Sequence, residues 1–305
     1  MRLVSFIDQQ GNICAGAIAG ERVIDLTQAI AALALRASIA ERGLVAPASG
    51  MLRLLYAGAA GIAAIRQHVD STVAVGGLDG LPFWRELKLM APIPRPGKIV
   101  AIGRNYADHA KETGVQPFER PRIIAKLSSS VTGPGAVVQR PATVTKLDLE
   151  AELGVVIGSF AHNVPRERAL DMVAGYSVLN DLSAREFQFD VSPPQTTFAK
   201  SMDGFCPMGP WLVTADEITD PQTLEINSYL NDEPMQQGST ADMLFPVDRI
   251  IEYLSQFMTL EPGDVIATGT PAGSGAFRDP PIWLKSGDRV RIEIAQIGTL
   301  EHSIG

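Results

Sequence analysis

The stretch Leu147–Ile157, with the sequence LDLEAELGVVI, alternates between apolar and acidic residues over its first half. Residues two apart lie on the same face of a β-strand, so Asp148, Glu150 and Glu152 share one face of the predicted strand. After Glu152 both faces are apolar, which predicts that the strand runs from polar surroundings into a core. The stretch therefore predicts a strand-rich fold with acidic side chains where the strand enters that core.

The spacing of Glu150 and Glu152 allows both side chains to reach one cation. Residues two apart on a strand are separated by roughly 7 Å, so their carboxylates can converge on one ion. The apolar run Val178–Leu179 ends in Asn180 and Asp181, which offers a third carboxylate. No His or Cys accompanies these acids, which favours Mg²⁺ or Mn²⁺ over zinc, and Ca²⁺ could replace them in crystals. The alternative is a sheet with one wet, acidic face and no ion.

His109 and Glu112 lie three residues apart in a segment, Gly103–Glu112, that follows a predicted strand and reads as the start of a helix. This spacing places both side chains on one side of the helix. A glutamate beside an imidazole orients it and strengthens it as a base, as the activation of water requires. The alternative is an exposed pair without a function.

Two lysines and one hydroxyl could bind an anionic substrate. Lys200 follows a proline-containing loop, and Lys126 precedes Ser128–Ser130. A lysine at a strand end beside hydroxyl groups could hold a carboxylate or a developing enolate. Thr270, in the turn after a predicted strand at 265–268, could receive an anion, although that turn has a purely structural interpretation as well.

The rest of the chain after residue 98 is rich in predicted strands, with Gly and Pro turns between them. Besides Leu147–Ile157, they cover residues 98–102, 123–126, 177–180, 211–214, 224–230, 265–268 and 289–295. Two helices interrupt them: one over residues 166–174, stopped by Gly175, and one opened by Pro246, with Phe257 on its apolar face. The pattern predicts a mixed sheet or β-sandwich.

The first ninety residues form a smaller predicted domain. Three short strands at 3–7, 13–18 and 22–26 precede a helix from Thr27 to near Arg36, and helical stretches follow at 52–57 and 62–69. Three alternate prolines in residues 91–97 forbid a helix and indicate a linker. We therefore expect a small N-terminal α+β domain (1–90), a linker (91–97) and a larger domain (98–305).

Composition excludes several classes of protein. Of the 305 residues, 46% are hydrophobic and 20% are charged, which is ordinary for a globular chain. A net charge of −8 argues against nucleic acid and acidic membrane surfaces. Cys14 and Cys206 lie far apart, so a disulfide scaffold or zinc knuckle is not expected. No membrane span or secretory signal is recognisable, and we expect a cytoplasmic protein.

Five motifs in a fixed order resemble the fumarylacetoacetate hydrolase family from about Lys98 to the C-terminus. They are Gly103–His109, Lys126–Ser130 with Gly133–Gly135, Glu150–Leu153, Asn180–Arg185 and Gly269–Gly273. The resemblance implies a mixed β-sandwich roll, a homodimer and a divalent cation held by Glu150, Glu152 and Asp181. It also implies that His109 and Glu112 lie on a lid that closes over the substrate, and that Lys200 is catalytic.

For this chain the resemblance implies a hydrolase that cleaves a C–C bond in a 2,4-dioxo acid, such as an acylpyruvate or fumarylpyruvate. The products would be pyruvate and a carboxylic acid, in aromatic or sugar-acid catabolism. Arg104, Arg185 and Gln195 are candidates for the far end of the substrate, and Lys126 and Thr270 are further candidates for substrate binding. The loop Phe187–Gln195 departs from the usual family pattern, which leaves the substrate open.

Alternatives with the same site are decarboxylation of a 2-oxo diacid such as oxaloacetate and isomerisation of a hydroxymuconate-type diacid. A protein of another class would bind a ligand at the carboxylates without turnover. Such a binder should have lost the base or the lysine, and here both His109 and Lys200 are present.

Overall fold

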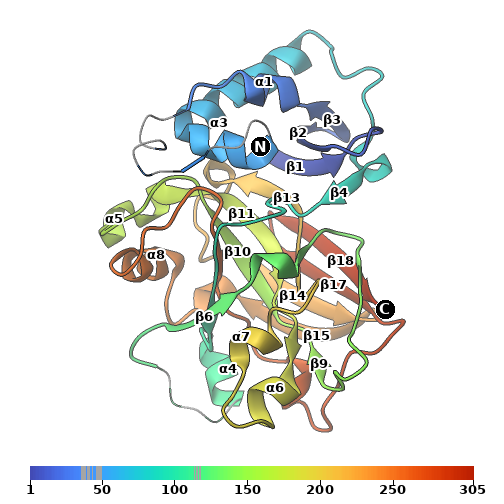
Figure 1. Cartoon of the computed structure of the whole chain (residues 1–305), viewed down its shortest axis with the longest axis vertical. Coiled ribbons are helices and arrows are strands. Elements are labelled where there is room, and N and C mark those ends of the chain that lie inside the picture. Colours follow the sequence, from blue (N-terminus) through green and yellow to red (C-terminus); the bar gives the residue numbers. More distant parts are fainter. Residues whose placement is uncertain are drawn as a thin grey trace.

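The computed structural model describes residues 1–35, 39, 42, 44–45, 50–112, 114, 116 and 118–305. Figure 1 shows the first helices and strands at one end of the molecule, with a larger strand-rich body below them. The predicted strand-rich α+β architecture is confirmed. Among the described residues, no helix is long and apolar enough to cross a membrane.

One large sheet joins both parts of the chain. Within the described residues it has eleven strands in the order β3-β2-β1-β13-β11-β10-β16-β5-β6, with β4 paired to β1 and β7 paired to β13. Their bounds are β1 Arg2–Ile7, β2 Ile13–Ala19, β3 Arg22–Asp25, β4 Lys88–Met90, β5 Ile99–Gly103, β6 Arg122–Lys126, β7 Val131–Thr132, β10 Ala151–Ile157, β11 Val173–Asn180, β13 Cys206–Thr214 and β16 Val265–Ala267.

A second sheet packs on the first to form the main core. Its order is β15-β14-β17-β18-β8, and a separate pair joins β12 to β9. Side chains such as Val155 of the first sheet and Ile292 of the second belong to one buried cluster. The bounds are β8 Val137–Val138, β9 Leu147–Asp148, β12 Ser183–Ala184, β14 Glu225–Leu230, β15 Glu233–Ser239, β17 Arg289–Ile294 and β18 Gly298–Ile304.

The helices are mostly short. They are α1 Thr27–Ala31, α3 Gly50–Ala74, α4 Ala107–Glu112, α5 Arg166–Ala169, α6 Arg185–Phe189, α7 Thr196–Ala199 and α8 Val247–Ser255. Gly58, with φ 68°, breaks α3 into two helical halves, as the two predicted helical stretches require. The first helix is shorter than predicted, because α1 ends at Ala31 and residues 33–35 are not helical; Arg36 itself lies outside the described residues. In Figure 1, α4, α6 and α7 lie together at the end of the body away from α1 and α3.

The predicted helix over residues 166–174 is wrong in its second half. Only Arg166–Ala169 is α-helical; a 3₁₀ turn follows, and Val173 begins β11. The predicted helix stop, Gly175, lies inside this strand, where a Cβ would sit 2.1 Å from the carbonyl oxygen of Val213. The glycine allows β11 and β13 to approach each other closely, and the local sequence pattern does not reveal this contact.

The helix opened by Pro246 is confirmed, but it ends at Ser255. Phe257 was predicted on its buried face and instead lies beyond the helix with 67% of its surface exposed.

The acidic strand is interrupted where the prediction had it continuous. β9 ends at Asp148 and β10 begins at Ala151, so Glu150 lies between two strands. The Glu150 N–H donates to the Asn180 side chain, and the Asp181 N–H donates to the Glu150 carbonyl at 2.9 Å. This break brings Glu150 and the end of β11 together.

The predicted N-terminal domain shares the large sheet with the rest of the chain. β1 pairs with β13 through Arg2↔Val213 and Leu3↔Leu212. The domain boundaries at residues 90 and 98 stay a prediction.

Candidate metal centre and active site

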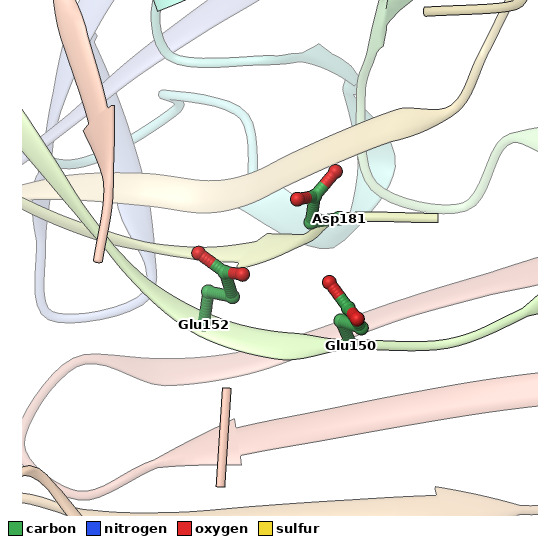
Figure 2. A group of neighbouring side chains, drawn as sticks. All are labelled: Glu150, Glu152 and Asp181. Carbon is green, nitrogen blue, oxygen red and sulfur yellow. The ribbon is translucent and has the colours of Figure 1, made fainter. Parts of the chain in front are cut away.

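Three carboxylates converge at the broken strand. One oxygen each from Glu150, Glu152 and Asp181 lie within 4.8 Å of one another. Figure 2 shows these side chains projecting into one space from β10, the residue before it, and the end of β11. Their exposed fractions are 6%, 2% and 1%, so the alternative of a wet sheet face is wrong.

A chain of buried polar contacts fixes the backbone beneath these acids. Asn180 accepts the Glu150 N–H at 3.0 Å and donates its amide to His302 Nε2 at 2.8 Å. Burial lowers the pKa of His302 to about 4, so the imidazole is neutral at pH 7. No local pattern connects His302, which lies 122 residues after Asn180, with this site.

Lys200 links two of the three carboxylates. Its ammonium donates to Glu150 Oε2 at 2.6 Å, to Asp181 Oδ2 at 2.7 Å and to Ser183 Oγ at 2.8 Å. Burial opposes the charge of Lys200, but the two carboxylates outweigh it and raise its pKa. Lys200 is therefore a fixed cation in contact with the acidic cluster.

Lys126 lies behind Asp181, outside the cavity. Its ammonium contacts Asp181 Oδ1 at 2.7 Å and donates to the carbonyl oxygens of Phe205, at 3.0 Å, and Lys200. Two hydrogen bonds and one ion pair therefore hold the ammonium in place. The geometry makes Lys126 a support for Asp181, whereas the sequence suggested direct contact with substrate.

Arg185 and Asp148 form a buried ion pair that reaches the same cluster. Arg185 donates through Nη2 to Glu150 Oε1 at 2.7 Å and through Nε to Asp148 Oδ2 at 2.9 Å. Burial opposes ionisation of Glu150, but Lys200 and Arg185 outweigh it and lower its pKa. Glu150 is therefore held ionised.

Asp148 extends this network to the loop around Gly275. Its carboxylate accepts the N–H groups of Gly275, at 2.7 Å, and Ala276, at 3.0 Å. A Cβ at Gly275 would lie 2.8 Å from Asp148 Oδ1, so only glycine permits this approach. Sequence reasoning placed Asp148 on the acidic face but gave it no role.

Glu152 is the carboxylate that lacks a cationic partner among the described residues. It accepts the Gly269 N–H at 2.8 Å. Burial raises its pKa well above the usual value, and the charges of Asp181 and Glu150 add to this effect. An added cation would relieve this repulsion, and three carboxylates are ligands that Mg²⁺ and Mn²⁺ prefer. The donor set therefore fits the predicted metal.

The carboxylates open into a cavity of about 310 Å³. Its lining includes Lys200, Arg185, His109, Arg104 and Thr270, all predicted site residues. This volume is at the lower end of the range for ligand sites, about 300–1,000 Å³, and suits a small molecule.

His109 and Glu112 are brought together in α4 as predicted. Nδ1 of His109 lies 2.9 Å from Glu112 Oε2, which leaves Nε2 for the cavity. Glu112 also accepts the Gly273 N–H at 3.0 Å, so the helix is attached to the 269–277 loop. The ring of Phe277 packs edge-on against His109, with centroids 5.3 Å apart. The imidazole is 4% exposed, so the alternative of an exposed pair is wrong.

Gln236, on β15, is a site residue that the sequence did not reveal. It is fully buried, accepts the Ala151 N–H at 2.9 Å and donates to Thr270 Oγ1 at 2.6 Å. Thr270 in turn donates to the Ala151 carbonyl at 2.9 Å. The Thr270 hydroxyl therefore joins β10 to the loop, and its proton is already in use. β15 itself was not predicted, because its sequence carries two glutamines and a proline.

The buried carboxylates, the fixed cations around them and a histidine base define a candidate divalent-metal active site on a strand-rich roll. Residues 98–305 match the family model described as fumarylacetoacetate (FAA) hydrolase C-terminal. The chain belongs to the fumarylacetoacetate hydrolase family, as the five sequence motifs indicated.

Two curated relatives carry the name oxaloacetate tautomerase. The YisK protein of Bacillus subtilis is 46% identical over 224 residues, covering 72% of this chain and 74% of its own. The human mitochondrial protein FAHD2A is 42% identical over 219 residues, covering 72% and 70%.

A solved relative supports both the fold and the metal. Maleylpyruvate hydrolase from Sphingobium, in complex with manganese(II) and pyruvate, matches with a TM-score of 0.77 and 31% identity over 100% of this chain and 98% of its own. The family-type fold is thereby confirmed. The named relatives are enzymes of two different reactions, so the family is established and the particular reaction is not.

Proposed function

We propose that this chain is a divalent-metal-dependent tautomerase of small 2-oxo acids, with oxaloacetate as the first candidate substrate. The observation that carries the proposal is the position of His109. Its Nδ1 is held by Glu112, and it lines the same small cavity as Glu150, Glu152 and Asp181. A base beside a metal centre is what proton transfer next to a 2-oxo group requires.

Glu150, Glu152 and Asp181 would hold Mg²⁺ or Mn²⁺. A bound ion of this kind supplies Lewis-acid charge to the 2-oxo group and so favours loss of a proton from the neighbouring carbon.

His109 moves the proton in this proposal. From the keto form, Nε2 takes one proton from C3 of the substrate, and Glu112 stabilises the resulting imidazolium. The 2-oxygen gains one proton from water, which gives the enol, and the imidazolium returns its proton to the hydroxide that remains. The reverse direction returns a proton to C3. No bond between heavy atoms forms or breaks.

The surrounding residues orient this step. Lys200 places a fixed positive charge beside the carboxylates, where negative charge develops on the substrate. Arg185 and Lys126 hold Glu150 and Asp181 in position. Phe277 covers His109 and keeps bulk water from the imidazole.

The named relatives favour tautomerisation over hydrolysis as the candidate reaction. The two proteins named oxaloacetate tautomerase are 46% and 42% identical to this chain, whereas maleylpyruvate hydrolase is 31% identical. The C–C hydrolase of 2,4-dioxo acids that the sequence predicted stays the second candidate. The manganese and pyruvate in that hydrolase structure favour it, because pyruvate is the product expected from an acylpyruvate. In hydrolysis His109 would take its proton from water.

The test is to follow three reactions with the Mg²⁺- and Mn²⁺-loaded protein. Enol-oxaloacetate loss is read from its ultraviolet absorbance, acetylpyruvate cleavage from pyruvate release, and oxaloacetate decarboxylation from carbon dioxide. We expect accelerated enol loss without pyruvate or carbon dioxide. Pyruvate from acetylpyruvate alone would replace the tautomerase with the hydrolase, and carbon dioxide alone would replace it with the predicted decarboxylase. Absence of all three would contradict the proposal and favour a binder without turnover.

Assembly and location stay predictions. The expected homodimer is checked by sedimentation equilibrium. The cytoplasmic location is checked by cell fractionation; the human relative is described as mitochondrial. Cys14 and Cys206 are both free and buried.

A further inference from the structure

Arg122, which no sequence motif singled out, lines the cavity beside Arg104. Strand pairing explains the position, because Arg122 on β6 stands directly opposite Gly103 on β5. A Cβ at position 103 would lie 3.3 Å from Arg122 Cδ. The glycine therefore leaves room for the aliphatic stem of Arg122 to lie across β5, next to Arg104.

Arg104 reaches the same cavity from an unfavourable backbone conformation. Its φ is +56°, in the left-handed region that residues other than glycine rarely adopt. The next residue, Asn105, is fully buried and fixes the turn, donating to the carbonyls of Thr268 at 2.7 Å and Phe245 at 3.0 Å. Strain held in place by such contacts is typical of functional sites.

The two guanidinium groups differ from Arg185 in having no carboxylate partner. Arg185 is paired with Asp148 and Glu150. For Arg104 and Arg122, the described part of the chain contains no hydrogen bond or ion pair from the side chain, only the ring of Phe118 at 5.9 Å from Arg104 Cζ. Burial lowers the pKa of Arg104, and the nearby charges of Arg122 and Arg185 add to this effect.

Arg104 is half-buried and Arg122 is exposed, and an anion in the cavity would offset the positive charge of the pair. The carboxylate cluster already provides for one end of a 2-oxo acid, so the anion that remains is a second acidic group on the same small molecule. Arginine is suited to a carboxylate because its planar donors match the two oxygens.

We propose that Arg104 and Arg122 form a subsite for the distal carboxylate of the substrate, which makes the enzyme selective for 2-oxo diacids over 2-oxo monoacids. The assignment rests on the proposed function, since the proximal end must lie at the metal centre.

The test compares two substrates of equal length, oxaloacetate and 2-oxobutanoate, which differ in a terminal carboxylate or methyl group. Exchange of the C3 protons in D₂O, followed by NMR with Mg²⁺ present, reports proton transfer for both. Background exchange without protein is subtracted. We expect the native protein to prefer the diacid in kcat/KM.

Arg104→Gln and Arg122→Gln should each reduce kcat/KM for oxaloacetate about ten- to a hundredfold, mainly through KM. The value for 2-oxobutanoate should change less than about threefold. Arg120→Gln, which removes the same charge from an exposed position outside the cavity, is the matched control and should leave both values unchanged. Equal losses for both substrates, or an unchanged preference in the double variant, would overturn the subsite.

A binding experiment separates this result from failure of the proposed function. The Mg²⁺-loaded protein is titrated calorimetrically with 2-oxoglutarate and with 2-oxopentanoate, again matched except for the terminal group. Tighter binding of the diacid, lost in the double variant, supports the subsite even where no tautomerase activity is found. Equal affinity for both compounds in the native protein refutes the subsite even where the enzyme is active.

Discussion

The cavity has two sides that differ in how their charges are compensated. Its floor consists of Glu150, Glu152 and Asp181 with Lys200 and the supporting residues behind them. Glu150 and Asp181 are paired there with cationic side chains of the protein. Its rim consists of Arg104, Arg122 and His109, and the polar groups that these residues turn to the cavity have few hydrogen-bond or ion-pair partners in the protein. Because the cationic side chains of the floor already donate to carboxylates, the floor is held in one geometry. The rim has free donors, which can bind a ligand that enters the cavity. The floor therefore holds the three metal-ligand candidates in place, whereas the rim carries the base and the groups proposed to recognise the substrate.

The largest effect is expected from removing a charge from the floor. Glu150→Gln should abolish stabilisation by Mg²⁺ or Mn²⁺ and reduce tautomerisation by about a thousandfold, because Lewis-acid assistance is worth several kcal/mol. Thermal unfolding with and without metal, together with the enol assay, measures both. Glu167→Gln, on the surface of α5, is the control and should retain both properties. Intact metal stabilisation in Glu150→Gln would show that the ion does not bind at the floor.

His109→Ala tests the rim, and unlike Glu150→Gln it should reduce activity without affecting metal binding. Loss of the base should reduce kcat by about a hundredfold to a thousandfold while metal-dependent stabilisation stays as in the native protein. Thermal shift and steady-state kinetics provide the two readings. His68→Ala, an exposed histidine on α3, should behave like the native protein. A parallel loss of metal binding in His109→Ala would remove the distinction between floor and rim.

The sequence revealed the floor better than the rim for a physical reason. Glu150 and Glu152 obey the two-residue period of a strand, and Asp181 ends a strand, so local patterns point to them. Arg122 and Gln236 carry no such pattern. They reach the site through strand pairing and through contacts 85 residues apart, such as that between Ala151 and Gln236.

The same limit explains the errors in the fold. The break between β9 and β10 depends on Asn180, which takes the Glu150 N–H that a continuous strand would have offered to a neighbour. Gly175 was interpreted as a helix stop. Glycine is needed there because the strand approaches the carbonyl of Val213 closely, and Val213 lies 38 residues further along the chain. Tertiary contacts of this kind override local preference.

Asp148→Asn tests how firmly floor and rim are joined. Asp148 connects Arg185 to the loop that carries Phe277, so removing its charge leaves a buried cation partly unpaired. We expect a loss of about 3 kcal/mol in the free energy of unfolding and about tenfold in kcat. Urea unfolding and kinetics measure these. Asp171→Asn, in an exposed pair with Arg168, should change stability by less than about 0.5 kcal/mol, and an equally small change in Asp148→Asn would show that the two sides are independent.

The smallest effect concerns His302 beneath the floor. Its pKa is about 4 in the folded protein and 6.5 when exposed, so between these values the unfolded chain binds a proton that the folded chain does not. Its contribution to stability is therefore complete above pH 6.5 and is lost as the pH falls towards 4, up to about 3 kcal/mol. His302→Gln keeps a hydrogen-bond acceptor for Asn180 but does not titrate. The melting temperature of this variant should fall less than that of the native protein between pH 7 and 4.5; identical pH profiles would exclude a buried neutral imidazole.

The pairing of β1 with β13 predicts how a shortened chain would behave. Leu3 and Leu212 stand opposite each other although more than two hundred residues separate them along the chain. A fragment restricted to residues 98–305 would leave one edge of β13 without its neighbour, and an open edge of that kind invites association with other copies. The N-terminal strand β1 therefore covers the edge of β13 and protects the part of the molecule that contains the carboxylates from aggregation.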